Sequence, residues 1–255
     1  MNEELNIVVP MAGRGSRFRD VGYQMPKPLI PVRGVEMIRL VIENLRPRRP
    51  HRFVFLCLDE HLKNFHLGKR LMDWAPGCKI VSVDQVTEGA ACTVLLSTPH
   101  IDSRQPLMIA NCDQWVDIDI DRYLESQDAP GVDGLIMTMK ASDPKWSYAR
   151  VSANGRVTEV VEKVVVSDEA TVGIYNFKRG EEFVAAAESM IGRNLRVNGE
   201  FYVAPAYNQL IERGRRIAIF NVGTVGNGMY GLGTPADLEA FIDSEAAMRA
   251  VKPLF

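Results

Sequence analysis

Long apolar runs, paired cysteines and a signal-like start are missing from this sequence. No apolar run approaches the roughly 18 residues of a membrane-spanning helix, and the start from Met1 to Leu5 is acidic rather than typical of a signal peptide. The four cysteines and four histidines show neither C-x-x-C nor metal-ligand spacing, so we expect no zinc site and no redox pair. These absences predict a cytoplasmic protein that does not enter a membrane, with cysteines serving as small packing residues.

A large net charge is also missing. The 255 residues carry a formal net charge of −2, and the isoelectric point is about 6.1. No broad basic field therefore attracts nucleic acid or anionic lipid, and an anionic ligand has to be held by a local cluster. An apolar content of 46% is enough to bury a sizeable core. With no internal repeat, one domain over residues 1–255 is the simplest reading.

The most informative stretch runs from Ile7 to Leu29. Its first three residues, Ile7–Val9, favour a strand buried on both faces. A loop containing Gly13 and Gly15 follows. In α/β sheets, ligands bind where loops leave the carboxyl ends of strands. Glycines there let backbone N–H groups face phosphate oxygens.

Two known glycine-rich phosphate-binding motifs can be compared with this stretch, and neither matches it. The dinucleotide fingerprint G-x-G-x-x-G would need a glycine where Phe18 stands, and no helical pattern follows directly. The P-loop ending Gly-Lys-Ser/Thr is absent. Arg14, Arg17 and Lys27 supply positive charge suited to a polyphosphate. A turn-rich surface loop with solvated arginines is the alternative.

The letters A-G-x-G-S-R at 12–17, followed by P-K-P-L at 26–29, resemble the signature of the sugar-phosphate nucleotidyltransferases, or nucleotide-sugar pyrophosphorylases. Two basic motifs in the same order make the resemblance specific. It implies that both motifs contact a nucleoside triphosphate, with Arg17 and Lys27 catalytic. The implied nucleotide-binding residues are Met11, Ala12, Gly13, Arg14, Gly15, Ser16, Arg17 and Lys27.

Strand and helix patterns alternate through the first half of the chain, which predicts a parallel sheet with helices on both faces. Strands are predicted at 53–58, 79–83 and 106–110, and helices at 35–45, 60–74 and 120–126.

The loop at 84–91 precedes another predicted helix. The resemblance implies that its residues Asp84, Gln85, Glu88, Gly89 and Ala90 receive the base and ribose. The family usually has a glutamine five residues before the glycine, whereas this chain has Asp84 there. Base identity is therefore open. A plain helix N-terminus with close packing is the alternative.

Asp113 follows the strand predicted at 106–110. A carboxylate at the carboxyl end of a central strand faces the same crevice as the glycine loop, where Mg²⁺ would bridge phosphates. In the resembling family this aspartate is a metal ligand and takes part in catalysis. The D-x-D motif of glycosyltransferases with a related core is the alternative, but the matching letters here are Asn111-x-Asp113.

From residue 133 onward the pattern is richer in strands, at 135–139, 148–151, 157–161 and 170–177, with helices at 181–191 and 205–213 and a late strand at 215–220. Glu162-Lys163 resembles the family's E-K element, which meets the acceptor hydroxyls and phosphate. The acceptor-binding residues implied are Tyr148, Glu162, Lys163 and Gly173. A final G-T-P turn at 233–235 precedes a helix predicted at 236–248.

Together these features predict a Rossmann-like, mainly parallel α/β sheet of the GT-A-like type with a small β-rich acceptor-side subregion. Residues 1–132 would bind nucleotide and residues 133–255 the acceptor. The implied reaction is Mg²⁺-dependent transfer of a nucleoside monophosphate from a triphosphate to a sugar 1-phosphate or similar acceptor. A cytidylyltransferase for choline or polyol phosphate, a glycosyltransferase, and a binding protein without turnover are the alternatives. Acceptor identity and homo-oligomer formation are open.

One departure concerns the metal. Sugar-specific relatives commonly place an aspartate two residues before the Gly-Thr of the final turn, where this chain has Gly231. We therefore expect a magnesium ion held by one protein carboxylate, Asp113, together with phosphate oxygens and water.

Overall fold

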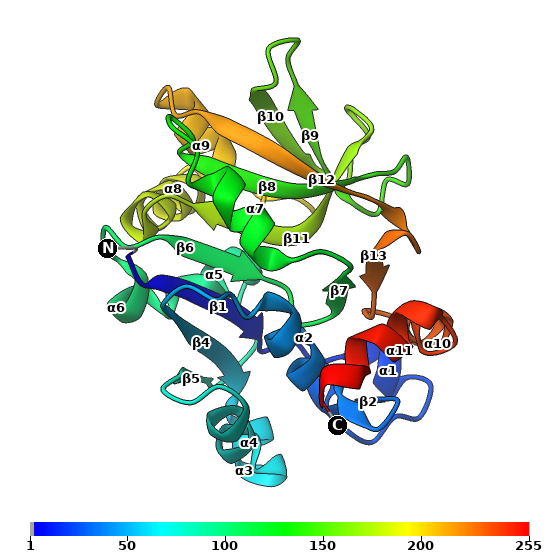
Figure 1. The fold of residues 1–255 in the computed structure, drawn as a ribbon. Coiled ribbons are helices and arrows are strands. Elements are labelled where there is room, and N and C mark those ends of the chain that lie inside the picture. Colours follow the sequence, from blue (N-terminus) through cyan, green and yellow to red (C-terminus); the bar gives the residue numbers. More distant parts are fainter. Residues whose placement is uncertain (1–2, 255) are drawn as a thin grey trace.

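The computed structural model describes residues 3–254 and is built around one continuous sheet (Figure 1). Its first half consists of β5 (Lys79–Val83), β4 (His51–Leu58), β1 (Leu5–Met11) and β6 (Leu107–Ala110), side by side in this order and all parallel. Nearly every residue of β1, β4 and β6 is buried, as their mainly apolar sequences require.

The second half extends the same sheet. Next to β6 lies β11 (Glu169–Phe177), antiparallel to both β6 and β8 (Gly134–Lys140). Beyond β8 come β12 (Ile217–Val225), β13 (Gly228–Gly231) and β7 (Gln114–Val116). The hairpin of β9 (Ser147–Val151) and β10 (Val157–Glu162) branches off β11. The predicted parallel α/β sheet with a β-rich second part is thus confirmed, with the strand-rich part continuing the main sheet.

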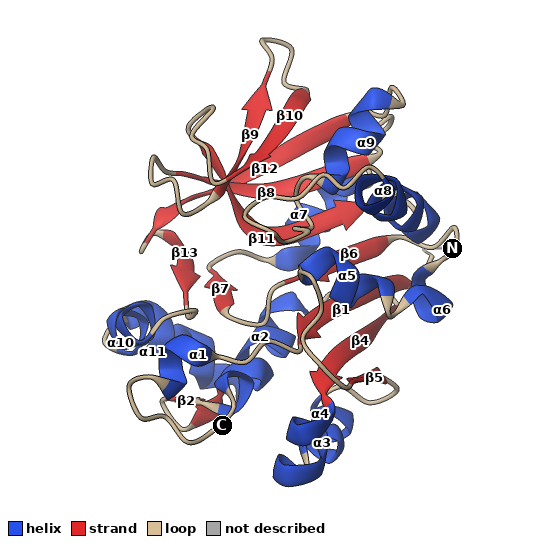
Figure 2. Cartoon of the chain, turned by 180° about the vertical axis from the view of Figure 1, so that it is seen from behind, coloured by secondary structure: helices blue, strands red, loops and turns tan. Residues whose placement is uncertain are grey.

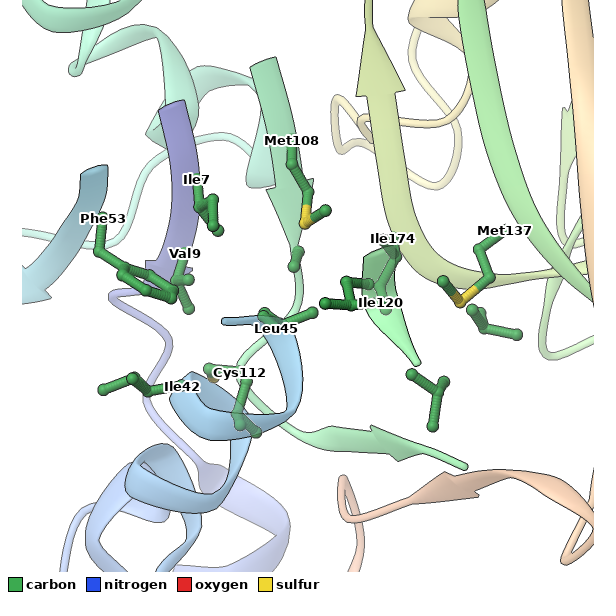
Figure 3. Packing of buried hydrophobic residues seen from close by; sticks show 14 of the residues in the cluster. Ile7, Val9, Ile42, Leu45, Phe53, Met108, Cys112, Ile120, Met137 and Ile174 are labelled. Atoms are coloured by element: carbon green, nitrogen blue, oxygen red, sulfur yellow. The ribbon is translucent and has the colours of Figure 1, made fainter. Parts of the chain in front are cut away.

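Helices cover both faces. On one face lie α2 (Met37–Leu45), α4 (Leu67–Trp74) and α7 (Ile120–Gln127), and Figure 3 shows Ile42 of α2 below Val9 of β1, and Ile120 of α7 between Leu45 and Ile174. On the other face, which Figure 2 shows from behind, lie α5 (Ala90–Leu95), α6 (Thr98–Ile101), α8 (Gly180–Gly192) and α9 (Ala206–Glu212). Val8 points to this second face, as alternation along a strand requires.

The chain's last helices pack beside its first loop (Figure 1). A third core cluster joins Phe18 of α1 (Ser16–Arg19) with Leu238 and Phe241 of α10 (Pro235–Ile242) and Val251 of α11 (Glu245–Val251). The small sheet of β2 (Pro31–Val32) and β3 (Val35–Glu36) belongs to the same cluster, and it is preceded by the single turn η1 (Lys27–Leu29), whose Leu29 packs in the first cluster. These contacts fix the segment that carries both basic motifs. A short turn η2 (Lys252–Leu254) follows α11.

Some predicted elements were wrong in extent. The helix predicted at 60–74 is two helices, α3 (Asp59–Phe65) and α4, because His66 adopts a left-handed φ of 50°. The helix predicted at 236–248 breaks before Ser244, whose hydroxyl caps α11. The helix predicted at 35–45 begins only at Met37, after β3. A helix, α1, does follow the glycine loop directly, and it is one turn long.

Candidate active site

The glycine loop and Asp113 meet at one edge of the sheet. Strands β1 and β6 are parallel neighbours, so the loops at their carboxyl ends open on the same side. Gly13, Gly15, Lys27 and Asp113 line one cavity of about 420 Å³, which we call the phosphate cavity. The sequence prediction that the two basic motifs and Asp113 share a crevice agrees with this arrangement.

Lys27 and Asp113 form an ion pair in this cavity, with 2.6 Å between Nζ and Oδ2. Burial lowers the pKa of the Lys27 amine, but the charge of Asp113 opposes this and the net pKa is raised above its ordinary value. The Lys27 amine is therefore charged at neutral pH. The neighbouring thiol of Cys112 is protonated there, because burial raises its pKa to about 11.

The glycine loop presents its backbone to the cavity. Within residues 3–254, the N–H groups of residues 12–17 donate no hydrogen bond to another protein group. Unpaired backbone donors in a glycine turn suit phosphate oxygens. The arginines of the loop diverge, however: Arg17 lines a cavity toward β11, whereas Arg14 lines a hollow on the other side of the loop.

A second cavity, of about 240 Å³, adjoins the phosphate cavity and is lined by Gly13, Val86, Thr87, Gly89, Ala90 and Thr93; we call it the base-side cavity. The loop that carries Val86 to Ala90 is held by the backbone of Phe201, whose N–H donates to the Glu88 carbonyl at 2.9 Å and whose carbonyl accepts from the Ala91 N–H at 3.0 Å. A Cβ on Gly89 would lie 2.4 Å from the Phe201 oxygen, so only glycine fits there.

Three of the residues predicted to bind the nucleotide do not line the base-side cavity. Asp84 and Gln85 are exposed, and Glu88 pairs with Arg196 at 3.2 Å. Val86, Thr87 and Thr93 face the cavity in their place. Sequence reasoning missed them because a loop without a regular period does not reveal which side chains turn inward.

A third cavity, of about 460 Å³, lies toward β9 and β11 and contains Arg17, Glu162, Lys163 and Gly173; we call it the acceptor-side cavity. Glu162 is 6% exposed and accepts a hydrogen bond from the Ser147 hydroxyl. Burial raises the pKa of the Glu162 carboxyl, with Ser147 and Lys163 opposing the effect. The Lys163 amine donates to the Tyr202 hydroxyl at 2.7 Å, and its pKa is raised by that bond.

Tyr148 does not join this cavity with its side chain. The ring is fully buried in the core, and its hydroxyl donates to the Asp143 carbonyl at 2.7 Å. Ser147 and Trp146 line the cavity instead. The Tyr148 side chain, which the sequence predicts to bind the acceptor, is therefore not among the residues that line this cavity. Gly173 does line the cavity.

Two residues that sequence reasoning did not assign lie where the cavities meet. Asn111 and Glu200, together with Ala90, line the phosphate, base-side and acceptor-side cavities. Glu200 comes from the loop segment 198–202, and a single exposed glutamate in a loop gives no signal of its own.

The donors around Asp113 suit a hard cation that shares its ligands with phosphate. Asp113, Asn111 and Glu200 offer oxygen atoms to one cavity, and Mg²⁺ commonly takes one or two carboxylates and completes its shell with phosphate and water. Within residues 3–254, no three His, Cys, Asp or Glu side chains gather to hold a metal ion on their own. Gly231 faces Gln114 across the β13–β7 pairing and adds no carboxylate. The residues therefore fit a cation that depends on bound phosphate.

A glycine loop, a lysine–aspartate pair and adjoining cavities at the edge of an α/β sheet define a protein that handles phosphate groups. Comparison with known proteins gives the family. The family model described as Nucleotidyl transferase matches residues 7–194, and the chain belongs to this family. The resemblance drawn from the two basic motifs is thus confirmed.

The relatives of this chain have modest sequence identity to it. The bifunctional protein GlmU of Ralstonia nicotianae is 27% identical over 222 residues, covering 82% of this chain and 45% of that protein. The mannose-1-phosphate guanylyltransferase catalytic subunit beta of Danio rerio is 26% identical over 180 residues, covering 68% of this chain and 49% of that protein. The chain thus spans about half the length of these curated relatives.

Solved structures confirm the fold. The nucleoside-diphosphate-sugar pyrophosphorylase from Vibrio cholerae matches with a TM-score of 0.77 and 23% identity, over 93% of this chain and 100% of that one. The inositol-1-phosphate CTP transferase from T. maritima matches with a TM-score of 0.77 and 17% identity, over 98% of each chain. In the described part of the chain no helix is both long and apolar enough to cross a membrane.

Proposed function

We propose that this chain transfers a nucleoside monophosphate from a nucleoside triphosphate to a sugar 1-phosphate or a similar phosphorylated acceptor and releases pyrophosphate. The observation that carries this proposal is the Lys27–Asp113 pair in the phosphate cavity, with the base-side and acceptor-side cavities adjoining it. Membership of the nucleotidyl transferase family supports it.

The reaction needs no general base. At neutral pH the acceptor phosphate is largely dianionic, since its second pKa is about 6, so one of its oxygens can attack the α-phosphorus directly. The bond between the α-phosphorus and the bridging oxygen then breaks, and pyrophosphate leaves with the electron pair. The protein's work is therefore alignment and neutralisation of charge.

Each part of the site has a role in this scheme. The loop N–H groups and Arg17 bind the triphosphate, while Lys27 neutralises charge that develops on the phosphate oxygens. Lys163 would hold the acceptor phosphate and Glu162 its hydroxyl groups. Asp113 would hold Mg²⁺, which would supply further positive charge to the triphosphate when bound.

A panel assay tests the proposal. The four nucleoside triphosphates are incubated with Mg²⁺ and with glucose, mannose and N-acetylglucosamine 1-phosphates, inositol 1-phosphate and choline phosphate, and pyrophosphate is measured. We expect release with at least one pair, and none from Asp113→Asn. Nucleotide binding without pyrophosphate from any pair would contradict the proposal and favour a binding protein.

The non-sugar acceptors are included because of one observation. The inositol-1-phosphate CTP transferase structure covers 98% of this chain, so a cytidylyltransferase for a polyol phosphate is the second candidate. Activity only with CTP and a non-sugar phosphate would select it. Consumption of a ready-made nucleotide sugar instead would select a glycosyltransferase.

A further inference from the structure

Three residues line the phosphate, base-side and acceptor-side cavities together. Within residues 3–254 they are Ala90, Asn111 and Glu200. In the proposed reaction the nucleoside, the β- and γ-phosphates and the acceptor would each occupy one of these cavities. The α-phosphorus is linked to all three parts during the transfer, so it has to lie where the cavities meet. The residues shared by the cavities are therefore the candidates for contact with the reacting atom.

Only one of these three side chains carries N–H donors. Ala90 presents a methyl group, and Glu200 offers only oxygen atoms. Asn111 ends in an amide with two N–H donors. Its side chain is exposed, and in the part of the chain that the structure describes it forms no hydrogen bond to another protein group. Two unused donors thus lie at the point where a phosphoryl group would be transferred.

The backbone of β11 holds Asn111 at this junction. Asn111 directly follows β6, and its N–H donates to the Gly173 carbonyl at 2.9 Å, which extends the pairing of β6 with β11 by one residue. Gly173 has a left-handed φ of 83°, and a Cβ at this position would overlap the Nδ2 atom of Asn111. The absence of a side chain at Gly173 therefore provides the space that the Asn111 amide occupies.

We propose that Asn111 is a catalytic residue whose amide N–H donates to a non-bridging oxygen of the α-phosphate during transfer. This role rests on the proposed function. An oxygen of the acceptor phosphate bonds to the α-phosphorus while the bond to the bridging oxygen breaks, pyrophosphate leaves with the electron pair, and no proton moves. Negative charge spreads over the equatorial oxygens in the transition state. A donor that is already in place stabilises this charge without reorganisation.

Steady-state kinetics of two variants test the proposal, with the triphosphate and acceptor that the panel assay selects. Asn111→Leu has a similar size and no donor, and Asn111→Asp has the same shape with an oxygen in place of the NH₂ group. Both should lower kcat about 100-fold or more, as removal of one such donor does, with triphosphate affinity within about threefold of wild type. Asn64→Leu is the matched control, because Asn64 is exposed on α3 and lines none of the three cavities. Thermal unfolding checks that each variant is folded.

A second measurement does not require turnover. The α,β-methylene analogues of the four nucleoside triphosphates are not cleaved between the α- and β-phosphorus atoms, so each can be bound with Mg²⁺ and observed by ³¹P NMR. We expect the α-phosphorus resonance of the bound analogue to differ between wild type and Asn111→Leu, while the γ-phosphorus resonance stays the same. Both resonances in Asn64→Leu should match those in wild type.

Several results would overturn the proposal. They are a near-normal kcat in Asn111→Leu, a loss confined to triphosphate affinity, an unchanged α-phosphorus resonance, and the absence of binding by any analogue. A normal kcat in Asn111→Asp would also overturn it, because the side-chain oxygen would then be the atom that matters. If wild type releases no pyrophosphate, the proposed function fails, and the ³¹P resonances still decide whether the Asn111 amide contacts the α-phosphate.

Discussion

The Lys27 ammonium lies 2.6 Å from Asp113 and points a positive charge into the phosphate cavity. A charge fixed before the substrate arrives stabilises a transition state without the cost of reorganising water. Pro26 and Pro28 flank Lys27 in the turn η1, and a residue that precedes a proline has fewer accessible backbone conformations.

Lys27→Met should lower kcat about 100-fold or more while changing triphosphate affinity much less, because the charge matters most where negative charge grows. Steady-state kinetics and equilibrium titration measure the two effects. The matched control is Lys63→Met, which removes another lysine–aspartate pair, that with Asp59 on the surface of α3. A near-normal kcat in Lys27→Met would mean that the Pro-Lys-Pro segment has only a structural role as a turn.

Glu162 is the buried carboxylate of the acceptor-side cavity. Glu162→Gln keeps the shape and should raise the acceptor KM about 10-fold or more with triphosphate affinity unchanged, because a charged hydrogen-bond acceptor is lost. Glu159→Gln, on the exposed part of β10, is the control. Burial raises the Glu162 pKa, so lowering the pH protonates it sooner than an ordinary carboxyl. Wild type should then lose acceptor affinity on acidification in a step that Glu162→Gln lacks; loss of triphosphate binding would contradict this placement.

Gly231 offers a test of the metal site. Its backbone is not in the left-handed region, and an added Cβ would meet only Asp237 at 3.8 Å, so a side chain fits. Gly231→Asp should tighten Mg²⁺ or Mn²⁺ binding to the nucleotide-free protein about tenfold relative to Gly231→Asn, which has the same size without the charge. Calorimetry measures both. Tight binding already in wild type would show that Asp113 is not the sole carboxylate.

For individual residues, the sequence motifs predict site residues that stand at a characteristic spacing, but they do not predict residues whose side chains turn inward from loops. Lys27, Asp113, Glu162 and Lys163 lie in the predicted cavities. Glu200 meets them only because the Phe201 backbone pairs with the loop before α5, a contact between segments more than a hundred residues apart. Nothing local in the sequence encodes that pairing.

The pairing of the Glu88–Ala91 segment with Phe201 is the main contact that shapes the site at the level of elements. It holds Glu200, the neighbour of Phe201, at the junction of the cavities. It depends on Gly89, whose φ of 134° and ψ of 170° are accessible to almost no other residue. Gly89 is therefore required for the contact between two backbone segments of the protein itself, whether or not a ligand is bound.

Two alanine substitutions separate these roles. Gly89→Ala should destabilise the fold by about 1–3 kcal/mol, because a side chain in that conformation meets the Phe201 backbone. Gly13→Ala meets nothing within 4 Å, so its stability should change by less than about 0.5 kcal/mol, while triphosphate affinity falls because the methyl group projects into the cavity. Chemical denaturation and nucleotide titration measure the pair. A stable Gly89→Ala protein would mean that the two segments separate easily.

Helices and strands with a regular spacing of apolar residues were predicted well. The points at which helices break were not predicted. The strands from Leu5 to Ala110 follow their apolar runs closely. The break at His66 and the cap at Ser244 interrupt helical patterns whose apolar spacing continues across them. Short strands such as β7 and β13 pair only through tertiary contacts, so their few residues carry no period of their own.

At the scale of the molecule, the predicted nucleotide and acceptor parts share one sheet and one core. β6 from the first part pairs with β11 from the second, with Ala110 opposite Ile174. Figure 3 shows Ile7 and Met108 in the same cluster as Met137 and Ile174. The predicted boundary at residue 132 therefore does not separate two cores, and separating the two parts would expose apolar surface on both.

We therefore expect residues 1–255 to unfold in one cooperative transition, with a calorimetric enthalpy close to the van't Hoff enthalpy. Triphosphate at 100 times its dissociation constant should stabilise the protein by about 2.7 kcal/mol and shift the whole transition upward by roughly 5 to 10 °C. Scanning calorimetry with and without nucleotide measures this, and Asp113→Asn with nucleotide serves as the control for the site. If only the triphosphate-binding part were stabilised, the trace would split into two transitions. That outcome would show that the contacts between β6 and β11 are too weak to couple the two parts.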